Sequence, residues 1–364
     1  MTKLSWYNDE IMDKSLTQRQ QTILNVLAGE AHGLKMTDIF RKSGLNVSQS
    51  TMLRDLSKLI DQSFVSKEGR TKSAKYKATM RYWVLTPIDV DEYFQTPQDE
   101  RHVYTAYRSE IYDVLRELEL FAPQQYAYFD DLARKYALVE QQLPDFLVKR
   151  TFEQLIIDLS WKSARIEGST YTLLETEQLL KNAVKSEKRT MEETLMVLNH
   201  KHAIEELMKN SSTYKKLSVF NIRTIHKILT EGLGVSDDLR RITVGISGTN
   251  YKPLDNYAQI EDALLQMVDL VNSRKHWSDK ILITLALLSY IQPFDDGNKR
   301  TARLTANSLL IARGLPPLSF RSVDDVQYKE ATILFYEKNN LYALRELLIE
   351  QVEFTFAEYF GVKA

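Results

Sequence analysis

A short stretch, residues 292–303, places cationic, acidic and glycine residues at spacings that suit phosphate binding. It reads Gln-Pro-Phe-Asp-Asp-Gly-Asn-Lys-Arg-Thr-Ala-Arg. Pro293 is expected to end the apolar helix before it, and a second helix is expected to begin near Lys299, so the turn lies at a helix N-terminus. Backbone N–H groups and the helix dipole favour an anion there. Gly297 would let the backbone approach a phosphate closely.

Two arginines follow this turn at helical spacing. Arg300 and Arg303 are three residues apart and therefore share a helix face. Asp296 stands beside them, and a hard oxygen ligand next to a phosphate site suits Mg²⁺–nucleotide binding. An interhelical turn with surface arginines would explain any one of these residues, but not the whole set in fixed register. An EF-hand is excluded, because Gln292 and Phe294 occupy positions that require oxygen ligands.

The stretch resembles the central motif of the Fic (Fic/Doc) family, His-Pro-Phe-x-Asp/Glu-Gly-Asn-Gly/Lys-Arg-x-x-Arg. It departs from the motif only at Gln292, which replaces the histidine. The resemblance extends over roughly residues 100–360 and implies AMP transfer from ATP to a protein hydroxyl, with Mg²⁺. It also implies the roles of the loop residues: Asp296 as metal ligand, Gly297 and Asn298 as anion hole, Arg300 and Arg303 as ligands of the outer phosphates, Phe294 as core anchor, and Gln292, Asn298 and Arg300 as the catalytic set.

The replacement of the histidine bears on the rate of transfer. In the family, the histidine accepts the proton of the attacking hydroxyl. The amide of Gln292 accepts a hydrogen bond but has no useful basicity near neutral pH, and a positioned general base contributes about 10²–10⁴-fold in rate. The sequence therefore predicts that nucleotide binding is retained and that transfer is impaired or altered.

Two further segments can be interpreted from the same family resemblance. Ser163-Ala-Arg-Ile-Glu167-Gly resembles the family's inhibitory motif, in which Glu167 would pair with Arg303 and displace the γ-phosphate; an ordinary helix C-terminus is the alternative. Residues 242–251 alternate β-branched residues around Ser247-Gly248, which predicts a hairpin. It resembles the family's flap, which pairs with a target peptide through Ile246, Ser247, Gly248, Thr249 and Tyr251.

The N-terminal segment predicts a second function. Helical periodicity near residues 16–27, 36–42 and 48–60, followed by a basic hairpin, resembles a winged helix-turn-helix. Residues 17–81 carry a net charge of +7 in a chain whose net charge is −1, which indicates a polyanionic partner. We expect DNA contacts from Gln49, Ser50, Thr51, Arg54, Lys67, Arg70, Lys72 and Lys75. A winged helix that binds protein is the alternative.

Composition limits the remaining choices. The 364 residues include no cysteine, which excludes a disulfide scaffold and a cysteine nucleophile. No signal peptide or membrane-spanning run is apparent, so we expect a cytoplasmic protein without a membrane partner. The predicted fold is mainly α: a winged helix-turn-helix (1–81), a linker (82–99), a helical region with the inhibitory motif (100–190) and an all-helical Fic core with a hairpin flap (191–364).

The leading functional hypothesis is an autoinhibited, weak Fic-type nucleotidyltransferase that acts on an unidentified protein. A catalytically inactive, nucleotide-binding DNA regulator is the alternative. A third hypothesis is transfer of another group, such as phosphate or phosphocholine. A homodimer is left open by the sequence.

Overall fold

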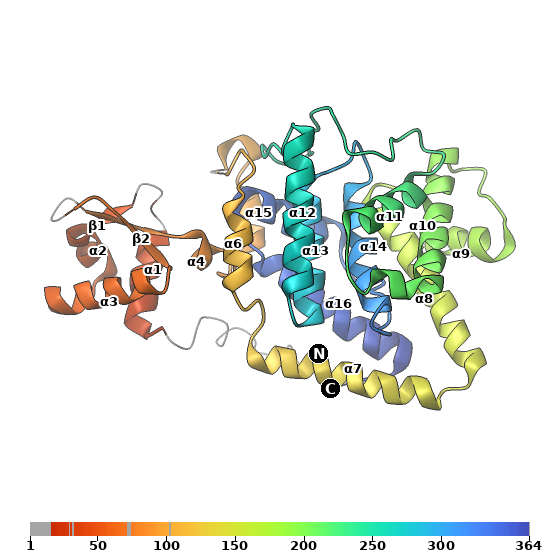
Figure 1. Cartoon of the computed structure of the whole chain (residues 1–364), viewed down its shortest axis with the longest axis horizontal. Helices are drawn as coiled ribbons and strands as arrows, with labels where there is room; N and C mark the ends of the chain where they lie inside the picture. The colour runs from red at the N-terminus through yellow and green to blue at the C-terminus, as the bar shows by residue number, and fades with distance from the viewer. Residues whose placement is uncertain (1–15, 29, 31–32, 71–73, 102, 364) are drawn as a thin grey trace.

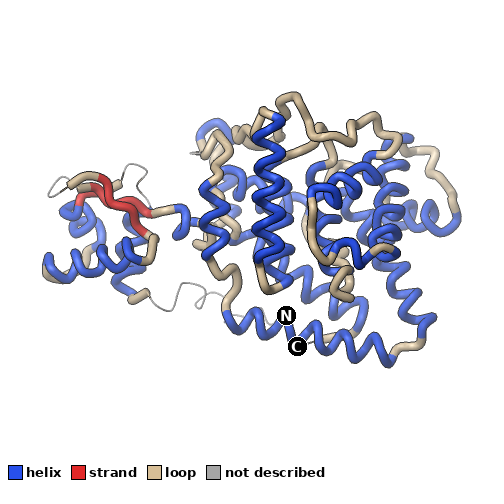
Figure 2. The backbone as a smooth tube through the Cα atoms, viewed as in Figure 1, coloured by secondary structure: helices blue, strands red, loops and turns tan. Residues whose placement is uncertain are grey.

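The chain forms a small N-terminal body with a sheet and a larger helical body, which lie along the longest axis of the molecule (Figure 1). The computed structural model describes residues 16–28, 30, 33–70, 74–101 and 103–363. Within these ranges all the named strands belong to the N-terminal body, as Figure 2 shows in red. The expectation of a mainly helical fold is confirmed.

The N-terminal body packs three helices against a three-stranded antiparallel sheet. Its strands follow the order β1-β3-β2, and β2 pairs with β3 from Val65↔Ala78 to Glu68↔Lys75. The basic hairpin predicted from the sequence is therefore present. The elements are α1 (Gln18–Ala28), β1 (Leu34–Lys35), α2 (Met36–Ser43), α3 (Gln49–Asp61), β2 (Val65–Glu68) and β3 (Lys75–Ala78).

Local signals set the boundaries of α2 and α3. Gly44 follows α2 in the left-handed conformation, with φ of 61°, which glycine adopts at low cost. The side chain of Ser48 accepts a hydrogen bond from the backbone N–H of Thr51 and so caps α3. Met52 and Leu56 then lie one turn apart on the buried face of α3.

The helical body surrounds one nearly fully buried helix, α13. It packs against α12, α14, α15 and α16, and its apolar residues are buried on all sides, as expected of a helix at the centre of a domain. Within the described ranges, no helix combines the length and apolar character needed to cross a membrane. The elements are α6 (Glu110–Glu117), α7 (Pro123–Gln142), α8 (Asp145–Ile166), α9 (Leu173–Asn182), α10 (Met191–Lys209), η3 (Ser211–Tyr214), α11 (Val219–Thr230), α12 (Tyr257–Ser273), α13 (Trp277–Ile291), α14 (Asn298–Ile311), α15 (Asp325–Lys338) and α16 (Tyr342–Phe360).

The segment expected to be a linker, residues 82–99, packs against the helical body. It contains the end of α4 (Met80–Trp83), α5 (Val90–Gln95) and the start of η2 (Gln98–Glu100). The side-chain amide of Asn340 donates to the backbone carbonyl of Trp83 at 2.5 Å. The backbone N–H of Leu341 donates to the backbone carbonyl of Val84 at 2.6 Å. These bonds give the connection a fixed path between the two bodies.

The hairpin predicted at residues 242–251 is absent. The segment turns at Ser247–Gly248 but has no ladder between its two arms. Its one bridge is parallel and joins Lys252 to Ala106, outside the predicted hairpin. The alternation of β-branched residues was therefore misleading, because the backbone groups of this segment bond to other parts of the chain.

Candidate functional site

The predicted anion-binding turn joins α13 to α14 in the middle of the helical body. Gln292 ends α13 with φ of 50°, and Gly297 precedes α14 with φ of 76°. A Cβ atom on Gly297 would lie 3.2 Å from Cγ2 of Thr230, so the turn requires glycine for space as well as for conformation. The first N–H groups of α14 have no partner within that helix, and they border the turn.

The side chain of Asn298 holds the turn closed. Its Oδ1 accepts from the backbone N–H of Phe294 at 2.8 Å, and its Nδ2 donates to the carbonyl of the same residue at 2.8 Å. Phe294 is buried and stacks on His226, with ring centroids 3.6 Å apart. The amide of Asn298 is thus engaged by Phe294. The backbone N–H of Asn298 and the second N–H of its Nδ2 remain as donors for an anion.

Arg300 presents a buried guanidinium with spare donors. Its side chain is 2% exposed, and Nη2 lies 3.2 Å from Oδ2 of Asp296. Nε and Nη1 are buried without a hydrogen-bond partner in the part of the chain that the structure describes. Burial lowers the pKa of Arg300. Unsatisfied buried donors of a cation are costly, so this side chain is suited to an anionic ligand that supplies acceptors.

Arg303, one turn further along α14, is engaged by the end of α8. Its Nη2 donates to Oε1 of Glu167 and to the carbonyl of Ser163, both at 2.9 Å, and its Nε donates to Oγ of Ser163 at 2.9 Å. The guanidinium also lies over the ring of Tyr328, 5.2 Å from the centroid. Burial acts to lower the pKa of Arg303, but the charges of Glu167 and Tyr328 and the hydrogen bonds to both together raise it. The structure therefore brings together Ser163, Glu167 and Arg303.

His200 supports this contact from α10. Its Nδ1 faces the carbonyl of Met196 at 2.9 Å, so Nδ1 must carry the proton. Its Nε2 is then the acceptor for the hydroxyl of Ser163 at 2.8 Å, which leaves the Ser163 oxygen to accept from Arg303. Burial, followed by the charge of Arg300, lowers the pKa of His200 to about 3. Nothing in its sequence context singled out this histidine.

Asp296 is the predicted metal ligand. Its side chain is 71% exposed at the mouth of the turn, beside Arg300. Among the described residues, no cluster of three or more histidine, aspartate or glutamate side chains could enclose a metal. Mg²⁺ commonly takes one or two carboxylates and completes its shell with water and substrate phosphates. The single carboxylate therefore fits Mg²⁺ that arrives with a nucleotide.

Gln292 is anchored at the base of the turn. Its Nε2 donates to the carbonyl of Ser289 at 2.7 Å and lies 3.5 Å from the hydroxyl of Tyr336. Because a carbonyl only accepts, the amide nitrogen must face Ser289, and Oε1 forms the other branch of the amide. That oxygen can accept a hydrogen bond from an incoming hydroxyl, but it cannot take up the proton.

A buried arginine that the sequence did not single out connects the turn to the segment after α11. Nε of Arg240 donates to the carbonyl of Gln292 at 2.5 Å, and its Nη1 donates to that of Ile242 at 2.8 Å. Nη2 donates to the carbonyl of Leu254. Arg240 thus spans both ends of the predicted flap and holds them against the turn.

The flap residues have two different surroundings. Thr249 and Tyr251 are buried, and the hydroxyl of Tyr251 donates to the carbonyl of Tyr290 at 2.9 Å. Their side chains anchor the segment and present no exposed surface to a target. Ser247 and Gly248 are exposed, whereas Ile246 is half-buried.

Arg101 fixes the tip of this segment. Its Nη2 donates to the carbonyl of Gly248 at 2.5 Å. The same guanidinium bonds to both oxygens of Glu337, each at 3.0 Å. Glu337 also accepts from the hydroxyl of Tyr93 at 2.7 Å. Arg101, which lies just after the segment that connects the two bodies, therefore holds the flap tip. This contact joins residues too far apart in sequence for any local pattern to reveal.

The predicted DNA-contacting residues of α3 are only partly available. Gln49 and Arg54 are exposed. The hydroxyls of Ser50 and Thr51 each lie 2.9 Å from Oγ of Ser48, the residue that caps α3. These two hydroxyls are shared with the cap, so fewer of the predicted contact residues have a free side chain than the sequence predicted.

The hairpin β2–β3 carries cations on its solvent side. Lys67, Arg70 and Lys75 are exposed, and Lys75 lies opposite Glu68 in the ladder. This acid offsets part of the positive charge. Lys72, the remaining predicted contact, lies outside the described residues.

The turn and the helices on both sides of it match a known family. Residues 216–310 match the model of the Fic/DOC family. Over these residues the chain is similar to Fic/DOC proteins, and the match includes the turn, α13 and most of α14.

Curated relatives and solved structures agree with this assignment. Proteins named "Protein adenylyltransferase Fic" are 30% identical over 198 residues in Nematostella vectensis and 27% identical over 195 residues in Drosophila willistoni. The alignments cover 50% and 51% of this chain but 44% and 38% of those proteins, so the chain spans less than half of their length.

The structural neighbours establish the fold. Fic-1 from C. elegans is 13% identical, with a TM-score of 0.54 over 95% of this chain and 99% of that one. A Fic domain containing signaling protein from Bacteroides thetaiotaomicron is 18% identical, with a TM-score of 0.51 over 65% of this chain and 97% of that one. At such identities the likeness concerns the fold alone.

Proposed function

We propose that this chain transfers AMP from ATP to a hydroxyl group of a protein, in a form that Glu167 restrains and that Gln292 makes slow. The observation that carries the proposal is Arg300, a buried cation with unsatisfied donors beside a glycine turn at a helix N-terminus. The names of the curated relatives support AMP as the transferred group.

Each part of the proposed reaction has a residue of this chain. The backbone at Gly297 and the guanidinium of Arg300 would bind phosphate oxygens, and Arg303 would join them once Glu167 releases it. Mg²⁺, held in part by Asp296, would neutralise charge on the phosphates. The target hydroxyl would attack the α-phosphorus, forming an oxygen–phosphorus bond as the bond to the pyrophosphate leaving group breaks.

The proton of that hydroxyl determines the expected rate. Gln292 can orient the hydroxyl through Oε1, but the proton must pass to water. Removal of a positioned base lowers rates by about 10²–10⁴-fold. We therefore propose weak transfer by the chain with Gln292, without loss of nucleotide binding.

Labelling with two forms of ATP tests the reaction. ATP labelled at the α-phosphate should mark protein in the presence of Mg²⁺, and ATP labelled at the γ-phosphate should not. The Arg300→Ala variant should lose the label. Marking by the γ-phosphate form would replace AMP transfer with phosphoryl transfer, and no marking by any variant, Gln292→His included, would favour a binding protein without catalysis.

A DNA-binding role for residues 1–81 forms the second part of the proposal. Three helices, a three-stranded sheet and a cationic hairpin make up the described part of this body, an arrangement that suits a winged helix-turn-helix. If labelling fails, a nucleotide-binding DNA regulator is the remaining candidate. The division into a DNA-binding module, a connecting segment (82–99), an inhibitory helical region (100–190) and a Fic core (191–364) belongs to the same proposal.

A further inference from the structure

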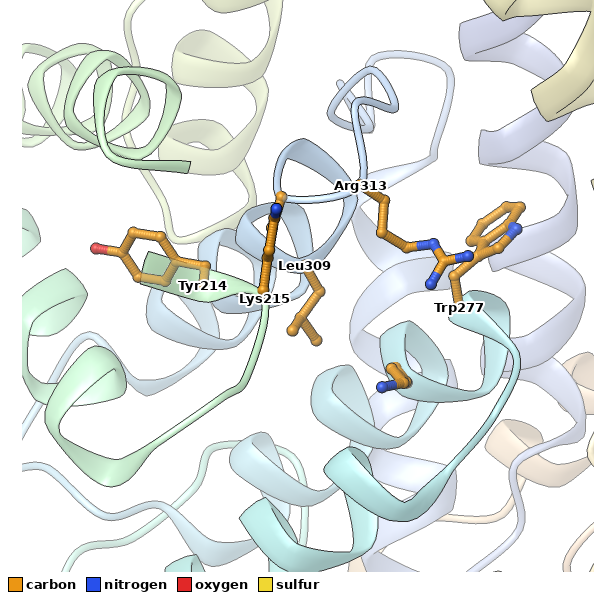
Figure 3. A pocket seen from close by; sticks show the side chains of 7 residues that line it. Tyr214, Lys215, Trp277, Leu309 and Arg313 are labelled. Atoms are coloured by element: carbon orange, nitrogen blue, oxygen red, sulfur yellow. The ribbon is translucent and has the colours of Figure 1, made fainter. Parts of the chain in front are cut away.

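A second cationic pocket lies at the ends of α13 and α14 that are remote from the turn. Its volume is about 310 Å³, within the range of small-molecule sites. Figure 3 shows the side chains around it, with Arg313 reaching toward Trp277. It is lined by Tyr214, Lys215, Trp277, Lys280, Leu309, Ala312 and Arg313.

The lining is strongly asymmetric in charge. Lys215, Lys280 and Arg313 come from three separate segments, and no acidic side chain lines the pocket. In the described part of the chain, none of the three forms an ion pair. Burial and the positive charge of Arg313 lower the pKa of Lys280, which shows that the cations act on one another. Such a group is stabilised by an anion that enters between them.

The backbone around the pocket also favours a negatively charged ligand. Lys280 lies in the first turn of α13, where the helix dipole is positive. At the opposing end of α14 two carbonyls are already engaged: that of Leu310 accepts from the backbone N–H groups of Arg313 and Leu315, and that of Ile311 accepts from Gly314. The acid of the same turn, Asp279, is paired with Arg274 through two hydrogen bonds, so it does not pair with the cations of the pocket.

We propose that this pocket binds a small molecule that carries a phosphate group. Three cations on separate segments can surround a doubly charged phosphate with charge-assisted hydrogen bonds. Leu309 and Ala312 offer an apolar surface for a short carbon chain attached to it. Trp277, a buried residue, contributes its ring to the wall.

The pocket is separate from the turn. α13 has 15 residues, so its two ends are about 22 Å apart at roughly 1.5 Å per residue. A phosphate bound at one end cannot contact Arg300 at the other. The two sites can therefore be distinguished by substitution, and the proposal does not depend on the proposed transferase activity.

Tryptophan fluorescence of the full chain, titrated with inorganic phosphate without Mg²⁺ and at constant ionic strength, tests the proposal. We expect a saturable change that the Trp277→Phe variant abolishes. Lys280→Gln combined with Arg313→Gln should weaken binding by roughly tenfold or more, because charge-assisted hydrogen bonds are lost. Lys215→Gln, from a different segment, should weaken it as well.

Two controls make the result decisive. Lys149→Gln combined with Lys185→Gln removes the same amount of positive charge from exposed positions elsewhere. This variant should leave the midpoint of the phosphate titration unchanged. Arg300→Ala should do the same. The proposal is overturned by the absence of a Trp277-dependent change through the millimolar range, by an unchanged midpoint in the pocket variants, or by a midpoint that moves with Arg300→Ala.

Discussion

Glu167 and Arg303 form an ion pair of 2.9 Å, although they lie 136 residues apart in the chain. The guanidinium of Arg303 is fully buried, whereas the carboxylate of Glu167 is 21% exposed. The pair thus joins the end of α8 to the second turn of α14. A nucleotide that needs Arg303 must compete with a contact already formed.

The first prediction concerns this competition. Glu167→Gln keeps the size of the side chain but removes its charge, and the affinity for ATP with Mg²⁺ should rise. A coupling free energy of about 1–3 kcal/mol between the ion pair and the nucleotide corresponds to a rise in affinity of about 5–150-fold. Calorimetry measures it, and Glu187→Gln at an exposed position is the matched control. Equal affinity in the Glu167 variant and the natural sequence would remove the inhibitory role.

The second prediction concerns Gln292→His. Nδ1–H of the histidine can donate to the carbonyl of Ser289, which now accepts from the glutamine, and Nε2 then remains as a base. Labelling from ATP should rise by up to about 10²–10⁴-fold, most clearly together with Glu167→Gly. Gln292→Asn should not raise it. Robust labelling by the natural protein that Gln292→His abolishes would indicate a different chemistry.

The third prediction is a pH dependence of stability. Burial lowers the pKa of His200 to about 3 and that of His226 to about 4. Both stay neutral in the folded chain but take up a proton in the unfolded chain below pH of about 6.5, so stability is lost as the pH falls. Between pH 7.5 and 5.5 the free energy of unfolding should fall by about 1.4 kcal/mol for each histidine.

Denaturant unfolding at the two pH values measures this loss. His200→Gln removes one titrating group, so the difference between the two pH values should shrink by about the contribution of one histidine. His202→Gln changes an exposed histidine two positions along the same helix and serves as the control. An undiminished difference in the His200 variant would show that another group carries the pH dependence.

The fourth prediction concerns the tether of the flap tip. Arg101→Gln leaves the buried carboxylate of Glu337 without its cation, and loss of one partner of a buried pair costs about 3–5 kcal/mol. Amide hydrogen exchange should increase at residues 246–250, because the bond to the carbonyl of Gly248 is also lost. Arg116→Gln, whose ion pair with Asp269 is exposed, should change little. Unaltered exchange at Gly248 and its neighbours would show that the flap holds its position without Arg101.

The fifth prediction concerns DNA. Lys67→Glu combined with Lys75→Glu should weaken binding to duplex DNA and flatten its dependence on salt by roughly two phosphate contacts. Mobility shifts over a series of salt concentrations measure the slope. The control is Lys149→Glu combined with Lys185→Glu in the helical body. An unchanged slope of DNA affinity against salt concentration would show that the hairpin does not contact the DNA.

The sequence alone predicted the features that depend on neighbouring residues. Pro293 and Gly297 determine where one helix ends and the next begins, and helical spacing places Arg300 and Arg303 on one face. The helices predicted near residues 36–42 and 48–60 likewise correspond to α2 and α3. These features were predicted because backbone conformation and helical periodicity act over only a few residues.

The flap shows where local reasoning failed. Residues 242–251 have the alternation of a hairpin, but Arg240 and Arg101 bond to the carbonyls of Ile242 and Gly248. The backbone N–H of Lys252, just beyond the segment, bonds to the carbonyl of Thr105. Because each backbone group needs a partner but not a particular one, the pattern could not show which partner it would take.

Only the tertiary structure decided how the turn is surrounded. It supplied Glu167 and Ser163 to Arg303, His200 to Ser163, and Arg240 to the carbonyl of Gln292. These contacts join residues dozens to more than a hundred positions apart. Their formation depends on how whole helices pack, which no short-range pattern specifies.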